Sequence, residues 1–261
     1  MLQYLRRAWH IAKSEGLKAL VKKSIIHLDL KTGLLSPFVT LYIRSLGRRF
    51  VSINDVLNLC FGNAFISEFI KPAQVKEEIS ALLHFLKHLK PKVILEIGTA
   101  RGGTLFLWTF IASDDATIIS IDLPGGPFGG GYPLLRKILY KSFKRHKQRI
   151  VLIRGNSHSL RTLRRVKEVL GEKKIDFLFI DGDHSYEGVK RDFEMYSPLV
   201  RKGGVIALHD IVPGSQELVG GVPRFWKELK KGLRTNKVIE IVKDWNQGGY
   251  GIGLIFKDMT S

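Results

Sequence analysis

Residues 93–104 read VILEIGTARGGT, a short apolar run that gives way to a glycine-rich segment. The apolar run predicts a buried strand over 93–97, and the helix-like pattern after it places the glycines where a strand turns into a helix. The backbone at such a turn can approach a ligand closely. The dinucleotide fingerprint Gly-x-Gly-x-x-Gly is broken, because Ala100 stands where the second glycine belongs. The segment therefore indicates a nucleotide-type binding loop that departs from the dinucleotide pattern.

Further apolar runs follow, separated by segments long enough for helices, and this alternation predicts a parallel sheet. These runs are 117–121, 150–153, 175–180 and 205–208. The last two runs, 238–242 and 250–256, are joined by a segment too short for a crossover helix, so they should pair antiparallel. We therefore expect an α/β fold with a Rossmann-like sheet, mostly parallel and closed by an antiparallel hairpin at its C-terminal end.

Composition places the chain among globular proteins. It has 261 residues, of which 44% are hydrophobic and 25% charged. The single cysteine, Cys60, excludes an internal disulfide framework and a cysteine-based zinc site, and it favours a reducing, cytoplasmic compartment. No apolar run approaches the roughly 20 residues needed to cross a bilayer, and basic residues interrupt the region where a signal peptide's apolar segment would lie.

Two parts are expected along the chain. Residues 1–70 combine helix-like apolar spacing with basic residues and predict an N-terminal helical extension. Residues 71–261 contain the alternating pattern, and near their start Pro72 suits a first helical turn. A basic amphipathic helix can lie on an anionic membrane, yet the same spacing also serves packing on the chain's own domain, so peripheral membrane contact and plain packing both stay open.

The formal net charge is +18, and residues 136–174 contain only two acids, Glu168 and Glu172. A surface this basic suits a polyanionic partner, and a nucleic-acid-binding protein or RNA methyltransferase is an alternative function. The basic segment lacks aromatic residues interleaved in a recognition motif, and solvated helix faces explain its charges equally well.

Polar residues follow the second and third predicted strands. Asp122 comes about 20 residues after the glycine loop, where an acid accepts both ribose hydroxyls in nicotinamide and other adenosine-containing cofactors alike. Asn156 and Ser157 follow the third strand, where an adenine edge would lie, although a plain turn explains them nearly as well.

The fourth and fifth strands end in the richest chemistry. Asp181 and His184 follow the fourth strand, and His209 and Asp210 end the fifth. Ligands bind at the carboxyl ends of strands in open α/β sheets, so we expect these groups to converge. Carboxylates such as Asp181 and Asp210 suit Mg²⁺ or a similar divalent ion, and a histidine at position 184 suits proton abstraction near neutrality. Asp183 and Ser185 have a simpler explanation as caps of the next helix.

These segments together resemble the class I S-adenosylmethionine (SAM)-dependent methyltransferases of family 24, also called cephalosporin-hydroxylase-like. The resemblance rests on LEIGTARGGT, on IDGDHSYEGV and on LVRKGGVIALHD, the last ending at Asp210. The resemblance is strong over nearly half of the chain, and the closing hairpin extends it to about residue 257. Related members are metal-dependent O-methyltransferases that act on sugars, and catechol O-methyltransferase is a more distant relative.

The resemblance implies a role for each matching residue. The glycine loop would hold SAM, with Glu96 near its cationic amino-acid end and Thr104 near its carboxylate. Asp122 would bind the ribose, and Asn156 and Ser157 would lie at the adenine. The remaining residues that we expect at the cofactor are Gly98, Thr99, Ala100, Gly102 and Asp181.

In the sugar enzymes an Asp-Gly-x-His motif supplies a metal ligand and a base, which here match Asp181 and His184. A second metal cluster in those enzymes is an acidic pair. Asp210 matches its aspartate, whereas His209 stands in the place of its glutamate, so that metal dependence stays open.

The expected function is therefore SAM-dependent methyl transfer to a hydroxyl of a small-molecule or glycan acceptor, assisted by a divalent cation on Asp181, His209 and Asp210, with His184 as the base. A nicotinamide-dependent oxidoreductase is a weaker alternative, since its glycine fingerprint is broken. The acceptor, a homo-oligomeric state and the role of residues 1–70 are left open.

Overall fold

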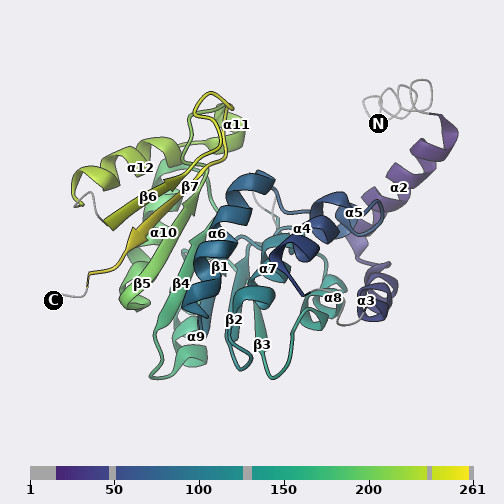
Figure 1. Ribbon diagram of the computed structural model, residues 1–261, viewed down its shortest axis with the longest axis horizontal. Coiled ribbons are helices and arrows are strands. Elements are labelled where there is room, and N and C mark those ends of the chain that lie inside the picture. The colour runs from purple at the N-terminus through teal and green to yellow at the C-terminus, as the bar shows by residue number, and fades with distance from the viewer. Residues whose placement is uncertain (1–15, 47–50, 126–130, 234–236, 259–261) are drawn as a thin grey trace.

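The computed structural model describes residues 16–46, 51–125, 131–233 and 237–258, and Figure 1 shows a central sheet covered by helices. Seven strands form this sheet in the order β3-β2-β1-β4-β5-β7-β6. Their bounds are β1 Val93–Ile97, β2 Thr117–Asp122, β3 Arg149–Arg154, β4 Ile175–Ile180, β5 Val200–His209, β6 Val238–Ile241 and β7 Ile252–Phe256.

The sheet confirms the predicted alternation and closing hairpin. Strands β1 to β5 pair in parallel, and β7 lies between β5 and β6, antiparallel to both. The main difference is β5, which begins five residues before the apolar run predicted at 205–208. Its polar start is held by Arg201, whose Nε atom donates to Asp176 Oδ1 on β4 at 2.5 Å. A cross-strand ion pair thus extends the strand beyond what its apolar pattern predicts.

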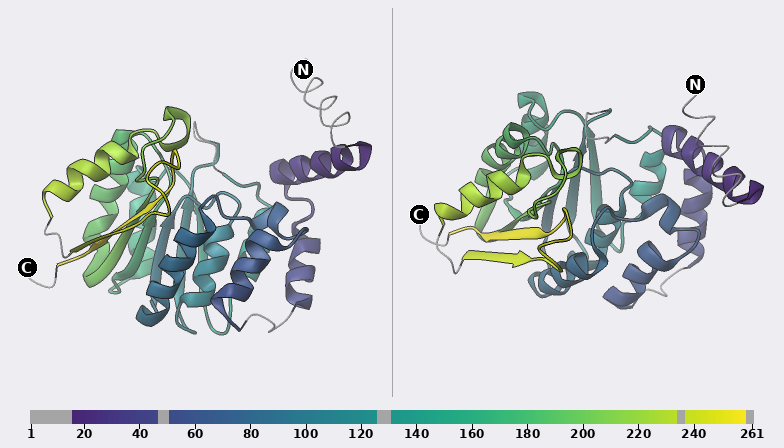
Figure 2. Two further views of the ribbon diagram at one scale, coloured as in Figure 1. Left: turned by 45° about the horizontal axis from the view of Figure 1, so that its top comes forward. Right: turned by 90° about the horizontal axis from the view of Figure 1, so that it is seen from above.

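Helices cover both faces of the sheet, as the two views in Figure 2 show. Their bounds are α2 Leu17–Thr32, α3 Ser36–Ser45, α4 Ile53–Gly62, α5 Ser67–Ile70, α6 Lys76–Leu89, α7 Gly103–Ile111, α8 Arg136–Ser142, α9 Leu160–Leu170, α10 Tyr186–Tyr196, α11 Gln216–Val219 and α12 Val222–Lys231, with a 3₁₀ turn, η2, at Ser197–Leu199. Helices α3 to α8 pack on one face, and α9, α10 and α12 pack on the other. None of the helices in the described ranges combines the length and apolar character that a bilayer span requires.

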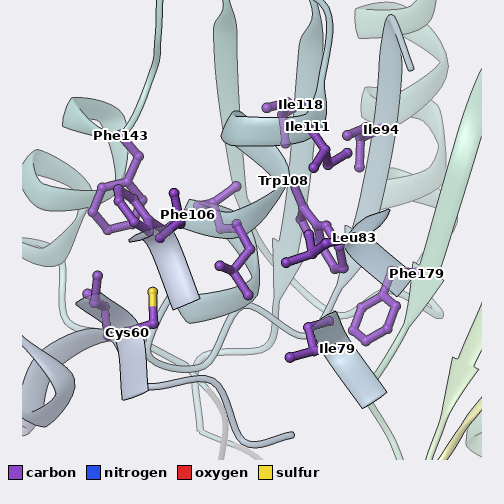
Figure 3. Close-up of a cluster of buried hydrophobic side chains, with 14 of the residues drawn as sticks. Cys60, Ile79, Leu83, Ile94, Phe106, Trp108, Ile111, Ile118, Phe143 and Phe179 are labelled. Atoms are coloured by element: carbon purple, nitrogen blue, oxygen red, sulfur yellow. The ribbon is translucent and has the colours of Figure 1, made fainter. Parts of the chain in front are cut away.

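Strand side chains divide between the two faces with a period of two. Ile94 belongs to the core on the α6–α7 side, whereas Val93 and Leu95 belong to the core on the α9–α10 side. Trp108 of α7 lies in the first core near Leu83 and Ile94, as Figure 3 shows, and it has no exposed surface. The sheet is therefore buried on both faces, as expected for parallel strands.

The N-terminal helices share the core of the sheet. Buried residues of α3, α4 and α5 join the same hydrophobic cluster as α6 and α7, with Cys60 among them and fully buried. The predicted boundary between residues 70 and 71 therefore falls inside one continuous core. Residues 1–15 and 47–50 of the predicted extension lie outside the described residues.

Candidate active site

The glycine loop between β1 and α7 is tightly fitted against the end of β4. Gly98 has a positive φ of 99°, and a Cβ atom there would collide with the backbone carbonyl oxygen of Asp181. The Gly98 amide donates to Ile121 O at 2.9 Å, and the Asp181 amide donates to Ile97 O at 2.9 Å. These contacts fix the loop between the ends of β2 and β4. Only glycine supplies both the conformation and the clearance.

Ala100 takes an unusual backbone conformation in this loop, with φ at 42°. Its amide donates to Asp122 Oδ2 at 2.8 Å, and its carbonyl accepts from the Tyr140 hydroxyl at 2.8 Å. The residue that breaks the dinucleotide pattern is thus held in the left-handed region by two hydrogen bonds that secure both of its peptide groups.

A cavity of about 410 Å³ opens between this loop and the ends of the neighbouring strands. Its volume falls in the range that small-molecule sites occupy. Its walls come from the segment between α5 and α6, from the glycine loop and the start of α7, from the residue after β4 and from the C-terminal hairpin: Lys71, Pro72, Ala73, Gln74, Gly98, Thr99, Ala100, Arg101, Gly103, Thr104, Asp181 and Tyr250. Five of the residues predicted at the cofactor, Gly98, Thr99, Ala100, Thr104 and Asp181, thus line one cavity.

Four titratable side chains meet at the carboxyl ends of β4 and β5. His184 Nε2 lies 3.5 Å from Asp181 Oδ1, and His184 Nδ1 lies 3.4 Å from Asp210 Oδ2. On the other side, His209 Nδ1 lies 3.1 Å from Asp181 Oδ1 and 3.3 Å from Asp210 Oδ2. Two carboxylates therefore stand between two imidazoles, and the predicted convergence is present.

His184 and Asp210 are held by the segment that follows β5. The Nδ1 atom of His184 lies 2.6 Å from the Leu218 carbonyl oxygen, and the His184 carbonyl accepts from the Gly221 amide at 2.7 Å. Asp210 has φ at 62°, a strained value for a residue with a Cβ atom. Its Oδ1 atom accepts from the Tyr250 amide at 3.1 Å. The end of β5 and the C-terminal hairpin thus position this half of the site.

The charges in this cluster depend on one another. Burial raises the pKa of Asp181, but His209 and His184 lower it by more, and the net pKa is well below the usual range. Burial lowers the pKa of His184, whereas Asp181 and Asp210 raise it, and the pKa rises to about 9 overall. The pKa of His209 lies well above its ordinary value, because the same two carboxylates outweigh its burial. Without another cation at the site, the two carboxylates therefore favour the protonated form of both imidazoles.

The donor set fits a divalent ion. Asp181, His184 and Asp210 each offer a ligand atom, and these atoms lie within 4.8 Å of one another. His209 belongs beside this set, since its Nδ1 atom is taken up by the two carboxylates and its buried Nε2 atom has no hydrogen-bond partner among the described residues. The geometry therefore leaves His209 to orient the two carboxylates, which are the oxygen ligands of the set.

Glu96 lies beneath the loop rather than at the cavity wall. Its carboxylate is fully buried and accepts from Trp108 Nε1 at 2.8 Å and from the Ser120 hydroxyl at 2.6 Å. Burial raises its pKa to about 7 despite these hydrogen bonds. Direct contact between Glu96 and the amino end of a cofactor stays a prediction, and in this structure Glu96 supports the loop through β2 and α7.

The three residues predicted for the adenosine part lie outside that cavity. Asp122 is buried, and its Oδ1 atom accepts from the Gly131 amide at 2.7 Å. Asn156 Oδ1 accepts from the His158 amide at 2.8 Å, and the Ser157 carbonyl accepts from the Tyr196 hydroxyl at 2.7 Å. Gly102 lies against the Tyr140 ring rather than in the cavity wall. Their roles toward a cofactor stay predictions.

Gln74 is a site residue that the sequence pattern does not reveal. Its Nε2 atom donates to Asp181 Oδ2 at 2.9 Å from 107 positions away, and its buried Oε1 atom has no partner among the described residues. Nothing in the segment KPAQ marks this contact in advance.

Of the two residues predicted as caps of the helix after β4, Ser185 is the one that caps α10. Its hydroxyl accepts from the Gly188 amide at 3.0 Å, while Asp183 Oδ1 accepts from the Ser185 amide.

The sequence model of one family, described as a methyltransferase domain, matches residues 95–211, from β1 to the residue after Asp210. This range contains the glycine loop and all four residues of the charged cluster. The match to this methyltransferase family covers a little under half of the chain. The matched range thus includes the strands and loops that form most of the site, and the segment between α5 and α6 and the C-terminal hairpin complete the cavity from outside that range.

Two curated relatives share parts of the chain. The uncharacterised protein y4gI of Sinorhizobium fredii is 29% identical over 144 residues, which are 54% of this chain and 15% of that protein. The uncharacterised protein R132 of Acanthamoeba polyphaga mimivirus is 56% identical over 36 residues, 14% of this chain and 16% of that protein. The chain therefore spans about one sixth of the length of these relatives.

Solved O-methyltransferases share the fold of the methyltransferase domain and its flanking helices. An O-methyltransferase from Bacillus cereus, solved with S-adenosylhomocysteine (SAH), has a TM-score of 0.52 at 18% identity, covering 85% of this chain and all of that one. A caffeoyl-CoA O-methyltransferase assigned in Staphylococcus aureus has a TM-score of 0.54 at 18% identity, covering 84% of this chain and 98% of that one. The predicted α/β methyltransferase fold is confirmed.

Proposed function

We propose that the chain transfers the methyl group of SAM to a hydroxyl oxygen of a small-molecule or glycan acceptor. The observation that carries this proposal is the single cavity that joins the glycine loop to Asp181, the residue at the centre of the charged cluster. A cofactor on the loop and an acceptor at the cluster would share that cavity. Holding two reactants in line accounts for much of the rate in such transfers, up to roughly 7–11 kcal/mol.

The glycine loop and Gln74 suit the amino-acid end of SAM. Thr104 lines the cavity at the start of α7, and its hydroxyl and the neighbouring amides are donors for a carboxylate. The Gln74 Oε1 atom, which has no partner among the described residues, can accept a hydrogen bond from an ammonium group, and the Asp181 carboxylate beside it adds negative charge that suits a sulfonium. The cavity thus offers donors for the anionic end of SAM and acceptors for its cationic groups.

His184 is the group that we assign to proton removal from the acceptor hydroxyl. It must be neutral for this role, whereas Asp181 and Asp210 raise its pKa to about 9. A divalent cation held by the carboxylates of Asp181 and Asp210 would offset their charge on His184 and lower the pKa of an acceptor hydroxyl. His209 keeps the carboxylates in place through Nδ1.

Two cationic side chains line the cavity. Lys71 and Arg101 line it, both are exposed, and Asp181 is the acid among the lining residues. Tyr250 adds an aromatic wall next to His209, with ring centroids 6.1 Å apart. These side chains favour a polar acceptor that carries an acidic group beside its hydroxyl.

Cofactor binding and methyl transfer test the proposal in sequence. Isothermal titration with SAH and, separately, with NADH should give binding for SAH alone. Transfer from methyl-labelled SAM should then be measured against sugars, sugar acids and catechol-like diols, with mass spectrometry locating the new methyl group on oxygen. Absence of SAH binding at millimolar ligand would overturn the proposal, and so would a labelled product that carries its methyl group on nitrogen or carbon.

A further inference from the structure

The N-terminal helices carry large apolar side chains that face solvent. On α2 these are Val21, Ile25 and Leu28, between 48% and 55% exposed, and their spacing of four and three residues places them on one helical stripe. A single exposed leucine or isoleucine is common on protein surfaces, whereas a stripe of them along one helix indicates a binding surface.

The next helix repeats this arrangement. Leu34 is 56% exposed, and Phe38 and Leu41 on α3 are 66% and 62% exposed, again at helical spacing. Tyr42 lies beside them and contacts the ring of Phe65, with centroids 5.3 Å apart. Buried residues on the opposite side of α3, such as Val39 and Ile43, pack into the core. The apolar stripe is therefore a second face of a helix that is already anchored.

The α2 and α3 stripes belong to one region of the molecule. Lys22 of α2 lies 3.5 Å from the Ala64 carbonyl, and the next residue, Phe65, contacts α3 through Tyr42. Figures 1 and 2 both show α2 and α3 at the end of the molecule away from β6 and β7. We call the exposed face formed by residues 18–44 the N-terminal surface.

The charges of the N-terminal surface have one sign. Its cationic side chains are all exposed: Lys18, Lys22, Lys23, Lys31 and Arg44. The only acid in residues 16–46 is Asp29, which is buried and paired with Arg136 at 2.6 Å. Two copies of the chain joined face to face here would bring like charges together, whereas an anionic surface would neutralise them.

We propose that the N-terminal surface binds an anionic lipid bilayer, with Phe38, Leu41 and the α2 stripe inserted at the interface and the lysines at the headgroup level. Apolar residues beside lysines and arginines are the pattern of helices that lie in a membrane interface without spanning it. Each cation near such a surface adds attraction that decays within about one Debye length, roughly 8–10 Å at physiological salt. This binding does not depend on methyl transfer.

Vesicle sedimentation tests the proposal with the full chain. The protein should sediment with vesicles of phosphatidylcholine mixed with phosphatidylglycerol, and binding should fall both with pure phosphatidylcholine and with added salt. Phe38→Ser with Leu41→Ser should weaken binding about tenfold or more, because two large apolar side chains no longer enter the interface. Lys18→Gln with Arg44→Gln should weaken it about tenfold through charge alone.

Matched controls lie at the other end of the molecule. Ile239→Ser on β6 removes a side chain that is 41% exposed, and Lys227→Gln removes an exposed cation from α12. Both should bind as the wild type does, and thermal unfolding should show that all variants fold. Failure of folded protein to sediment with anionic vesicles would overturn the proposal. So would a dimer, seen by analytical ultracentrifugation, that the Phe38 and Leu41 substitutions dissociate.

Discussion

Arg136 of α8 and Asp29 of α2, 107 residues apart in the sequence, form a buried ion pair with 2.6 Å between Nη2 and Oδ2. Arg136 also donates from Nη1 to the Phe69 carbonyl at 3.0 Å, and Asp29 Oδ1 accepts from the Leu35 amide at 2.6 Å. Each ion therefore has partners beyond the other. The pair joins the N-terminal helices to the helix that precedes β3.

Breaking this pair should destabilise the whole protein. Asp29→Asn or Arg136→Met should lower the free energy of unfolding by about 3–5 kcal/mol, because one charge is left buried without its partner. Urea unfolding measures this. The exposed pair of Lys22 and Glu68, 2.9 Å apart, is the control, and Glu68→Gln should cost no more than about 1 kcal/mol. An equal loss of unfolding free energy for the two pairs would show that the Asp29–Arg136 pair does not hold the helices in place.

Replacing the proposed base should remove turnover and spare cofactor binding. His184→Ala should lower kcat by about 10²–10⁴-fold, the usual contribution of general base catalysis, with SAH affinity unchanged. His84→Ala on α6 is the control, since His84 is exposed and bonds its own helix through Ser80 O. A wild-type kcat in the His184→Ala enzyme would show that His184 does not take the proton of the acceptor.

Divalent ions should bind at the cluster of Asp181, His184 and Asp210. Electron paramagnetic resonance titration with Mn²⁺ should show one site, and Asp210→Asn should weaken it because a carboxylate ligand is lost. Exhaustive chelation should abolish methyl transfer, and Mg²⁺ should restore it. Full activity after chelation, confirmed by metal analysis, would instead mean that the site works without a metal ion.

Gln74 should matter for the cofactor. Gln74→Leu removes the donor to Asp181 Oδ2 and the free acceptor at Oε1, so SAH affinity should fall about tenfold, as expected for a hydrogen bond to a charged group. Calorimetry measures the affinity directly. Gln216→Leu at the exposed start of α11 should leave it unchanged. Wild-type affinity in Gln74→Leu would limit Gln74 to orienting Asp181.

The raised pKa of Glu96, about 7, predicts a pH effect on stability. Between the unfolded pKa near 4.5 and pH 7 the folded state holds more protons than the unfolded state, so stability should fall as pH rises through this window. Above pH 7, ionisation of the buried Glu96 should lower the free energy of unfolding by on the order of 3 kcal/mol. Glu96→Gln cannot titrate, so the stability difference between wild type and variant should change by about that amount between pH 4.5 and 8. A difference that stays constant with pH would place the pKa of Glu96 in its ordinary range.

The sequence predicts the sheet well, because each strand signals itself locally. Runs such as 93–97 and 175–180 are short, apolar and bounded by turn residues, and the structure places strands there. The convergence of Asp181, His184 and Asp210 also follows from the sequence, since parallel strands bring their carboxyl ends to one edge.

Contacts between distant segments have no such local signal. Gln74 and the Leu218 carbonyl hold Asp181 and His184, yet neither stands next to a motif. The same holds for Asp29, because strands β1 and β2 separate it from Arg136 in the sequence and its burial depends on the contact between α2 and α8. Glu96 illustrates the converse, since its place beside a glycine loop suggests a cavity residue, whereas Trp108 and Ser120 draw its carboxylate into the core.

The close fit of Gly98 against the Asp181 carbonyl limits how this site can diverge. Even a methyl group at position 98 would force the loop after β1 away from the end of β4, so substitutions in either segment must keep the glycine between them. New acceptor specificity is easier to gain where the wall is built by side chains alone, at Lys71, Arg101 and Tyr250. Descendants of this chain should therefore vary at the rim of the cavity while position 98 remains glycine.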